Sequence, residues 1–277
     1  MQGSSRDSLA ALREALAAET AGVDAATLHQ LSDELFAVTA LVAGSGPLRR
    51  AISDPGLRAE DKVRVVDSLL TGKVTPGTVA LVRLAAGRRW SESRDVVDSL
   101  ETLAVDAALT GAERSGQLDE VEDQLFRFER IVDGEPALRA ALTDRHLPGE
   151  RKSELVRRLL DGKVAPVTVA LVRQGVLHPR GRTIERVLEE FTSVAAQRRS
   201  RLVARVVTAT ALTADQQTRL ADALAREFGH EVRLQVVVDP SILGGMTVRI
   251  GDELIDASVL RKLNAARRHL AGRPGRV

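Results

Sequence analysis

The five histidines of this 277-residue chain are the side chains best suited to metal binding or to acid–base catalysis near neutral pH. They are scattered along the sequence, at His29, His146, His178, His230 and His269. None of them belongs to an HExxH pattern or to another close histidine pair with an acidic partner. We therefore expect no metal ligand and no general base among them.

Two glycine–lysine segments are the nearest approach to a phosphate-binding loop. They carry Lys73 and Lys163, but neither has the GxxxxGK[ST] spacing that turns backbone amides toward an anion. The pair Gly244 and Gly245 lies between two expected strands, so it lacks the strand-then-helix setting of a dinucleotide-binding loop. These segments are better explained as turns, and we expect no nucleotide cofactor.

Asp239 and Asp256 flank the expected C-terminal hairpin and are the best candidates for a pair of catalytic carboxylates. Asp239, however, precedes Pro240, an arrangement typical of a turn. Asp256 precedes an expected helix, where it or Ser258 can cap the first turn. We favour the structural interpretation, with paired carboxylates as the alternative. The sequence thus predicts no catalytic residue, no cofactor and no metal, and the chain is not expected to be an enzyme.

Arginine carries most of the positive charge and suggests nucleic acid as an alternative partner. The 40 Lys and Arg residues are nearly balanced by 38 Asp and Glu residues, which gives a formal net charge of +2. Acidic residues are interleaved with the arginine clusters, which favours local pairing on solvated helix faces. Only 2% of the residues are aromatic, so platforms for base stacking are nearly absent. We expect no nucleic-acid partner.

Cysteine is absent from the chain, which excludes disulfides and thiolate metal sites. There is also no run of about 18 uncharged apolar residues, and the first residues lack the basic end and apolar block of a signal peptide. We expect a protein that neither inserts into a membrane nor is exported.

An internal repeat organises most of the chain. The segment LLTGKVTPGTVALVR begins at Leu69, and LLDGKVAPVTVALVR begins 90 residues later at Leu159, with only three differences between them. At the same offset, LHQLSDELF from Leu28 aligns with LDEVEDQLF from Leu118. The sequence therefore predicts two copies of one structural unit.

Each copy has the apolar spacing of amphipathic helices, with apolar residues recurring at intervals of three and four. Further helices are expected at 59–70, 76–86 and 91–113, and Thr75 is placed to cap the second of them before Pro76. The 90-residue offset leaves room for only one helix at 91–113. We therefore predict two tandem helical bundles, 1–113 and 91–196, that share this helix.

From 197 onward, β-branched runs and alternating apolar residues indicate strands. Between the first two runs, Thr213 and Gln216 form a capping box at the start of a helix, which gives a β-α-β unit. A hairpin around Gly251 and a closing helix are expected to follow. The predicted fold is mainly α, with the two bundles followed by a small α/β domain at 197–277.

The C-terminal segment VVDPSILGGMTVRIGDELIDASVLRKLNAARRHL resembles the closing signature of the delta subunit of bacterial F-type ATP synthase, a relative of the mitochondrial oligomycin-sensitivity-conferring protein. The signature positions with a structural role are Asp239, Pro240, Gly244, Gly245, Gly251, Asp256 and Ser258. The stretch 118–196 is similar to the helical N-terminal domain of the same family. By the 90-residue offset, 1–90 is then a second copy of this helical domain. The resemblance is therefore to a long form with a duplicated helical domain.

This resemblance implies a non-catalytic stator at the cytoplasmic face of the membrane, peripheral to it, that links the catalytic head to the stalk while proton-driven rotation is coupled to ATP synthesis. A helical domain would hold the N-terminal segment of an alpha subunit, and the C-terminal domain would hold the b subunit. An amphipathic partner helix needs an apolar surface. The small residues of the repeated segment are candidates for it, namely Val79, Ala80, Val82, Val169, Ala170 and Val172. A helical adaptor or a nucleic-acid-binding protein is the alternative function.

Overall fold

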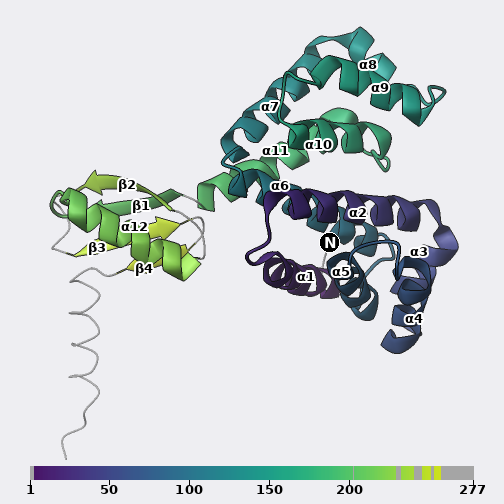
Figure 1. Ribbon diagram of the computed structural model, residues 1–277, viewed down its shortest axis with the longest axis horizontal. Coiled ribbons are helices and arrows are strands. Elements are labelled where there is room, and N and C mark those ends of the chain that lie inside the picture. Colours follow the sequence, from purple (N-terminus) through teal and green to yellow (C-terminus); the bar gives the residue numbers. More distant parts are fainter. Residues whose placement is uncertain (1–2, 202, 229–231, 240–244, 251–252, 257–277) are drawn as a thin grey trace, which may run out of the picture. The chain divides into compact units, whose positions relative to one another are not determined.

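A computed structural model describes residues 3–201, 203–228, 232–239, 245–250 and 253–256 of the chain. The chain divides into two compact units, Met1–Ala195 and Ala196–Val277. The first unit is helical and the second combines strands with a helix (Figure 1). The architecture is mainly α with a small α/β unit at the C-terminal end, as the sequence predicts.

The helical unit contains two series of helices that are joined by a further helix. The first series is α1 (Ser4–Thr20), α2 (Ala25–Gly44), α3 (Gly46–Ser53), α4 (Ala59–Leu70) and α5 (Pro76–Gly87). After α6 (Asp95–Arg114), the second series is α7 (Leu118–Gly134), α8 (Pro136–Thr143), α9 (Gly149–Leu160), α10 (Pro166–Leu177) and α11 (Ile184–Arg201). The bounds of α8, α9 and α10 each lie 90 residues after those of α3, α4 and α5. The repeat in the sequence is therefore a repeat of helices.

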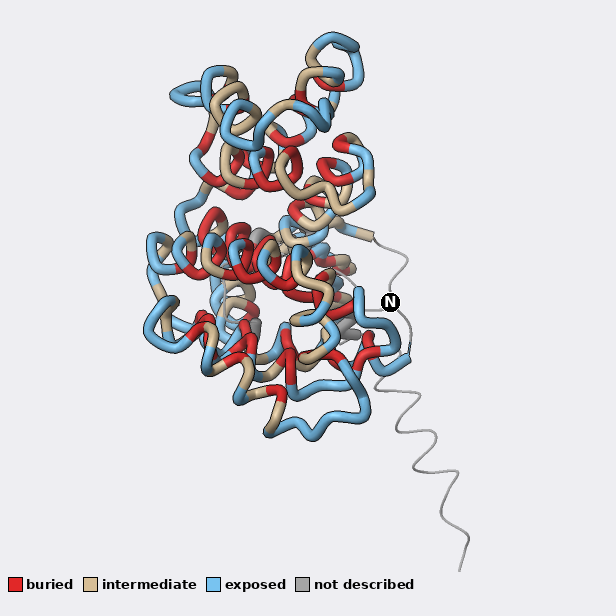
Figure 2. The backbone as a smooth tube through the Cα atoms, turned by 90° about the vertical axis from the view of Figure 1, so that its right-hand side faces the viewer, coloured by how far each residue is buried: buried red, intermediate tan, exposed pale blue. Residues whose placement is uncertain are grey.

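Helix α6 is buried along most of its length, because small and aliphatic residues occur on all its sides. It packs against α1, α2 and α5 of the first series and contacts α7 and α10 of the second. Figure 2 shows buried positions concentrated along the inward sides of the helices. The division into bundles 1–113 and 91–196 that share this helix stays a prediction.

The start of α6 lies four residues later than the sequence suggests, at Asp95 instead of Ser91. The reason is a bond to α1. The hydroxyl of Ser5 accepts a hydrogen bond from the backbone N–H of Ser91 at 2.7 Å and donates to Asp95 Oδ2 at 2.6 Å. These bonds hold 91–94 as an irregular connection along α1.

A polar clamp joins α2 to the start of α5 in the first copy and α7 to the start of α10 in the second. In the first copy, Glu34 Oε2 accepts hydrogen bonds from the backbone N–H of Thr75 at 2.9 Å and from the Thr78 hydroxyl at 2.5 Å. In the second copy, Gln124 Oε1 accepts from the Ala165 N–H at 2.9 Å and from the Thr168 hydroxyl at 2.7 Å. The predicted Thr75 cap is confirmed, since its side chain accepts from the Thr78 N–H. The clamp itself has no local sequence signal, because Glu34 and Thr75 are 41 positions apart.

Replacing Glu34 tests this clamp. Burial opposes ionisation of Glu34, but hydrogen bonds from Thr75 and Thr78 outweigh it and hold the pKa of its carboxyl below the usual value. Its contribution is therefore present above about pH 4.5 and is lost as the pH falls through the lowered pKa. We expect Glu34→Ala to reduce the free energy of unfolding by about 2 kcal/mol at pH 7, and Glu34→Gln by about 1 kcal/mol, in denaturant titrations.

The matched control is Gln124→Ala, which removes the same bonds from the second copy without removing a charge. It should reduce stability to a similar extent at pH 7 and at pH 4. If Glu34→Ala and wild type lose stability in parallel between pH 5 and pH 3, then the carboxylate of Glu34 does not hold the start of α5.

The described part of the α/β unit is a four-stranded mixed sheet in the order β2-β1-β3-β4 with one helix. Its elements are β1 (Val203–Thr208), α12 (Ala214–Phe228), β2 (Arg233–Val238), β3 (Met246–Ile250) and β4 (Glu253–Asp256). Strands β1 and β2 are parallel, as a β-α-β crossover requires, whereas β3 is antiparallel to both β1 and β4. One face carries the core, formed by Ala204, Val206, Leu224, Val232, Val248 and Ile250.

Several local predictions for this unit are confirmed. Thr213 and Gln216 form the capping box: each side-chain oxygen accepts a hydrogen bond from the other residue's backbone N–H, at 2.9 and 3.3 Å. Strands β3 and β4 pair as the expected hairpin, with Ile250 opposite Glu253. The closing helix predicted from Ser258 lies outside the described residues.

Candidate functional site

The family-signature residues that the structure describes lie at strand ends. The backbone N–H of Asp239 donates to Thr208 O at 2.9 Å and so extends the pairing of β1 with β2. Gly245 directly precedes β3 with φ of +83°, a left-handed conformation that disfavours any side chain. Asp256 is the last residue of β4 and pairs with Thr247. The remaining signature positions, Pro240, Gly244, Gly251 and Ser258, lie outside the described residues.

The small-residue surfaces predicted on α5 and α10 are largely internal. Val79, Val82 and Val172 are 7%, 2% and 0% exposed and belong to the core of the chain by itself. Ala80 is exposed, and Val169 and Ala170 are half-buried. The composition of the segment could not separate the two faces, because its buried and outer positions carry the same small apolar residues.

Large apolar side chains are instead exposed on α2 and α7. Leu41 on α2 and Ile131 on α7 occupy equivalent positions of the repeat and are 47% and 51% exposed. Phe126 on α7 is also 51% exposed, whereas its counterpart Phe36 is only 6% exposed on α2, which packs closely along α6. The second copy therefore has an outward-facing aromatic residue where the first copy has a core residue.

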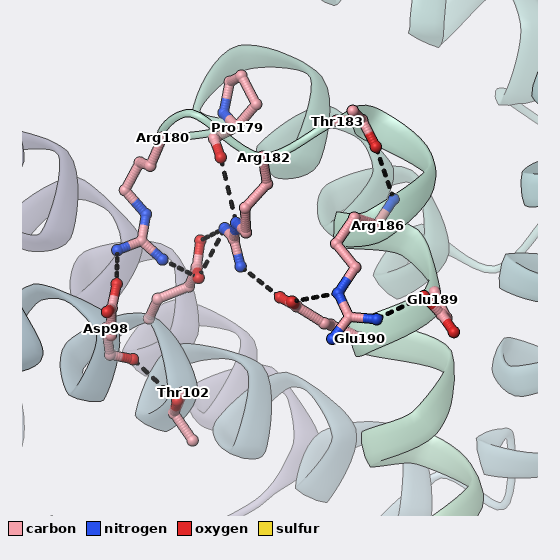
Figure 3. A network of polar contacts seen from close by, with 10 residues as sticks. Asp98, Thr102, Pro179, Arg180, Arg182, Thr183, Arg186, Glu189 and Glu190 are labelled. Carbon is pink, nitrogen blue, oxygen red and sulfur yellow. Dashed lines mark hydrogen bonds and ion pairs between the residues drawn. The ribbon is translucent and has the colours of Figure 1, made fainter. Parts of the chain in front are cut away.

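A network of ion pairs connects α6 with the loop after α10 and with α11 (Figure 3). At its centre is Glu101 of α6, which is 5% exposed. The guanidinium of Arg182 donates to both Glu101 carboxylate oxygens, at 2.8 and 2.9 Å, and to Glu190 Oε2 at 2.6 Å. Arg180 pairs with Glu101 and, at 2.5 Å, with Asp98. Two arginines of one loop thus share one buried carboxylate.

The backbone and the charges of this loop support each other. Arg180 has φ of +50°, which is strained for a residue with a side chain, and Gly181 follows at +82°. Burial opposes the charge on Arg182, but Glu101 and Glu190 outweigh it and raise the pKa of the guanidinium. The same environment lowers the pKa of His178, through burial first and then Arg180, against the opposing effect of Glu101. The network holds the loop on α6 with charged hydrogen bonds.

The equivalent loop of the first copy is fixed by neutral groups. Ser8, which corresponds to Asp98, donates from its hydroxyl to Arg89 O at 2.8 Å. Trp90 is buried and donates its indole N–H to Ala85 O at 2.9 Å. The ionic version has no sequence signal beyond interleaved charges, because the partners in the second copy are about 80 residues apart.

The described residues contain no group of three His, Cys, Asp or Glu side chains placed to hold a metal ion. No helix among them is long and apolar enough to span a bilayer. The described residues form packed helices, exposed apolar side chains and the network of ion pairs around Glu101, which we call the ionic joint. These features are typical of proteins that act through protein–protein contacts.

Comparison with known families decides what kind of protein this is. The family model described as ATP synthase delta (OSCP) subunit matches two segments, residues 11–108 and 105–270. The chain belongs to the ATP synthase delta (OSCP) subunit family. Within this family it is a non-catalytic subunit of the peripheral stalk, the stator of the complex. The two matches meet within α6, in agreement with a long form that carries a duplicated helical domain.

Relatives of similar length carry the same description. The ATP synthase subunits delta of Kineococcus radiotolerans and Acidothermus cellulolyticus are 45% and 48% identical to this chain. The alignments cover 98% of this chain in both cases, and 98% and 100% of the relatives. The ATP synthase subunit delta of a Parafrankia species is 46% identical over 98% of this chain and 99% of its own length. Membership in this family implies peripheral association with the membrane.

Proposed function

We propose that the chain connects the catalytic head of the ATP synthase to its stalk through two separate contacts. The second helical copy holds the N-terminal segment of an alpha subunit, and the α/β unit holds the b subunit, at the cytoplasmic face of the membrane. A part that resists rotary torque needs stiff elements and broad interfaces rather than polarised catalytic groups. The observation that carries the alpha contact is the exposure of Phe126.

The two copies differ in what they offer to an amphipathic helix. Such a helix docks by inserting apolar side chains against an apolar surface. Phe126 and Ile131 provide this on α7, whereas Phe36 is covered within the chain and leaves Leu41 alone on α2. The ionic joint around Glu101 supports this choice, because it fixes α6 to the second copy and so transmits load from that copy to the rest of the unit.

The b contact is assigned to the α/β unit. This unit is compact by itself, and β2 forms one edge of the described sheet. Val238 at the end of that edge strand is 47% exposed. An edge strand with an exposed apolar residue suits a partner helix or strand. The resemblance of the C-terminal signature to the family supports the same assignment.

Substitution of Phe126 tests the alpha contact. We expect Phe126→Ser to weaken binding of a synthetic peptide with the sequence of the alpha N-terminal segment by at least about tenfold, because exposed aromatic anchors dominate such interfaces. Ile131→Ser should weaken it less. Its counterpart Leu41→Ser is the matched control and should leave the affinity, measured by calorimetry, unchanged. If Leu41→Ser weakened binding of the peptide and Phe126→Ser did not, the alpha contact would lie on the first copy instead.

A further inference from the structure

A cavity of about 350 Å³ lies in the first copy, between the start of α4 and the end of α5. Four cationic residues are among those that line it, Arg58, Lys62, Arg88 and Arg89. Arg58 is engaged by Asp61 of α4, with 3.0 Å between its Nε and the carboxylate. The other three cations have no ion pair among the residues that the structure describes, so the cavity is positively charged.

Lys62 is the unusual member of this group, because it is only 4% exposed. Within the described residues, neither a hydrogen bond nor an ion pair compensates its ammonium group. Burial lowers its pKa, Asp54 opposes this effect, and Arg89 lowers the pKa further. A buried ammonium without a bonded anion costs free energy.

The cavity also lies at the start of helix α4. Helix α4 begins at Ala59, which lines the cavity, and its N-cap Arg58 makes no side-chain capping bond. The amides of a helix's first turn point toward an anion at its start and leave it a partial positive charge. The acidic residues of this turn, Glu60 and Asp61, reduce the field, and Arg58 pairs with Asp61. The buried ammonium of Lys62 is therefore the principal charge of the cavity without an ion pair among the described residues.

The second copy lacks this arrangement, although it keeps the lysine. Lys152 occupies the place of Lys62, but it is more exposed, and the positions equivalent to Arg88 and Arg89 are His178 and Pro179. The N-cap there is Pro148 instead of Arg58. The charged cavity is thus a property of the first copy alone.

We propose that this cavity binds the carboxylate of an acidic side chain from another subunit of the ATP synthase, so that the first copy is a separate anchor. Lys62 would pair with the carboxylate inside, and the exposed Arg88 and Arg89 would attract acidic residues at the rim. Leu57 at the rim is 43% exposed, and a flanking apolar residue of a peptide would cover it, which a free ion would not do. The proposal rests on the proposed function only in placing the chain inside the complex.

Carbodiimide cross-linking of the purified ATP synthase tests the proposal, because this reagent joins a lysine amine directly to a carboxylate that it contacts. Mass spectrometry should find Lys62 linked to an Asp or Glu of another subunit, and Lys152 without such a link. Lys62 unlinked, or linked only to its own chain, would overturn the site. Absence of the chain from the purified complex would instead refute the proposed function as well.

Two variants give an independent readout. Lys62→Met should leave the free energy of unfolding unchanged or raised, since a buried charge is removed, yet speed dissociation of the chain from the complex by at least about tenfold. Lys152→Met, the matched control, should change neither. Unchanged dissociation of Lys62→Met would overturn the proposal. Titration of the isolated chain with inorganic phosphate, followed by the NMR signal of the Lys62 side chain, distinguishes a free ion. A saturable shift of this signal, together with no intersubunit link, would also overturn the proposal.

Discussion

Replacing Glu101 with glutamine is expected to lower the free energy of unfolding of the helical unit by about 3 kcal/mol. The variant leaves Arg180 and Arg182 beside a neutral amide in a site where the native carboxylate is 5% exposed. Removing one partner of a buried ion pair costs far more than the pair contributes, because the remaining charge stays desolvated. Denaturant unfolding followed by circular dichroism measures the change.

The control for this variant is Glu189→Gln on α11. Glu189 pairs with Arg186 at 2.9 Å, but both side chains are about 60% exposed, so we expect a loss below about 0.5 kcal/mol. A triple variant, Glu101→Leu with Arg180→Met and Arg182→Met, removes the charges together and should recover part of the stability. Equal unfolding midpoints for Glu101→Gln and wild type would show that the ionic joint does not hold the loop on α6.

Val206→Asp is expected to unfold the α/β unit and to abolish binding of the b subunit. Val206 is 0% exposed on β1, between β2 and β3, and an unpaired carboxylate there costs about 3–5 kcal/mol, comparable to the whole stability of so small a unit. The helical unit should remain folded, because the two units are separately compact. Binding of a soluble b fragment and of the alpha peptide should be measured for the same preparation.

Arg205→Ser is the matched control, one residue away on the outer face of the same strand. Arg205 is exposed and pairs through its backbone with Gln235 and Arg249, so the sheet should tolerate the change. Retention of b by Val206→Asp at full affinity would contradict the assignment of the b contact to this unit. Loss of the alpha peptide together with b would indicate that the units do not fold separately.

Local features of the fold could be predicted because their causes lie close together in the sequence. The cap at Thr75 and the capping box of Thr213 and Gln216 each depend on residues three positions apart. The repeat could be recognised because one 90-residue offset reproduces the same turn and helix signals twice. The parallel pairing of β1 with β2 follows from the helical pattern between two strand-like runs.

Features that depend on distant partners could not be predicted in this way. The joint at Glu101 unites residues of α6 and of a loop about 80 positions later, and the sequence shows only that charges of both signs are frequent. The sequence does not separate the buried Val79 and Val82 from a contact surface, because small apolar residues occur on the inner and outer sides of α5 alike. The burial of Lys62 has no sequence signature, since Lys152 in the matching position is more exposed.

Site-directed photo-cross-linking in the assembled ATP synthase tests the division of contacts most directly. The chain contains no cysteine, so single cysteines can carry the cross-linker without a background. We choose Arg127→Cys, next to Phe126 on α7, and Gln235→Cys on β2, both exposed. The first should label the alpha subunit and the second should label b. Labelling of b from position 127, or of alpha from position 235, would contradict it.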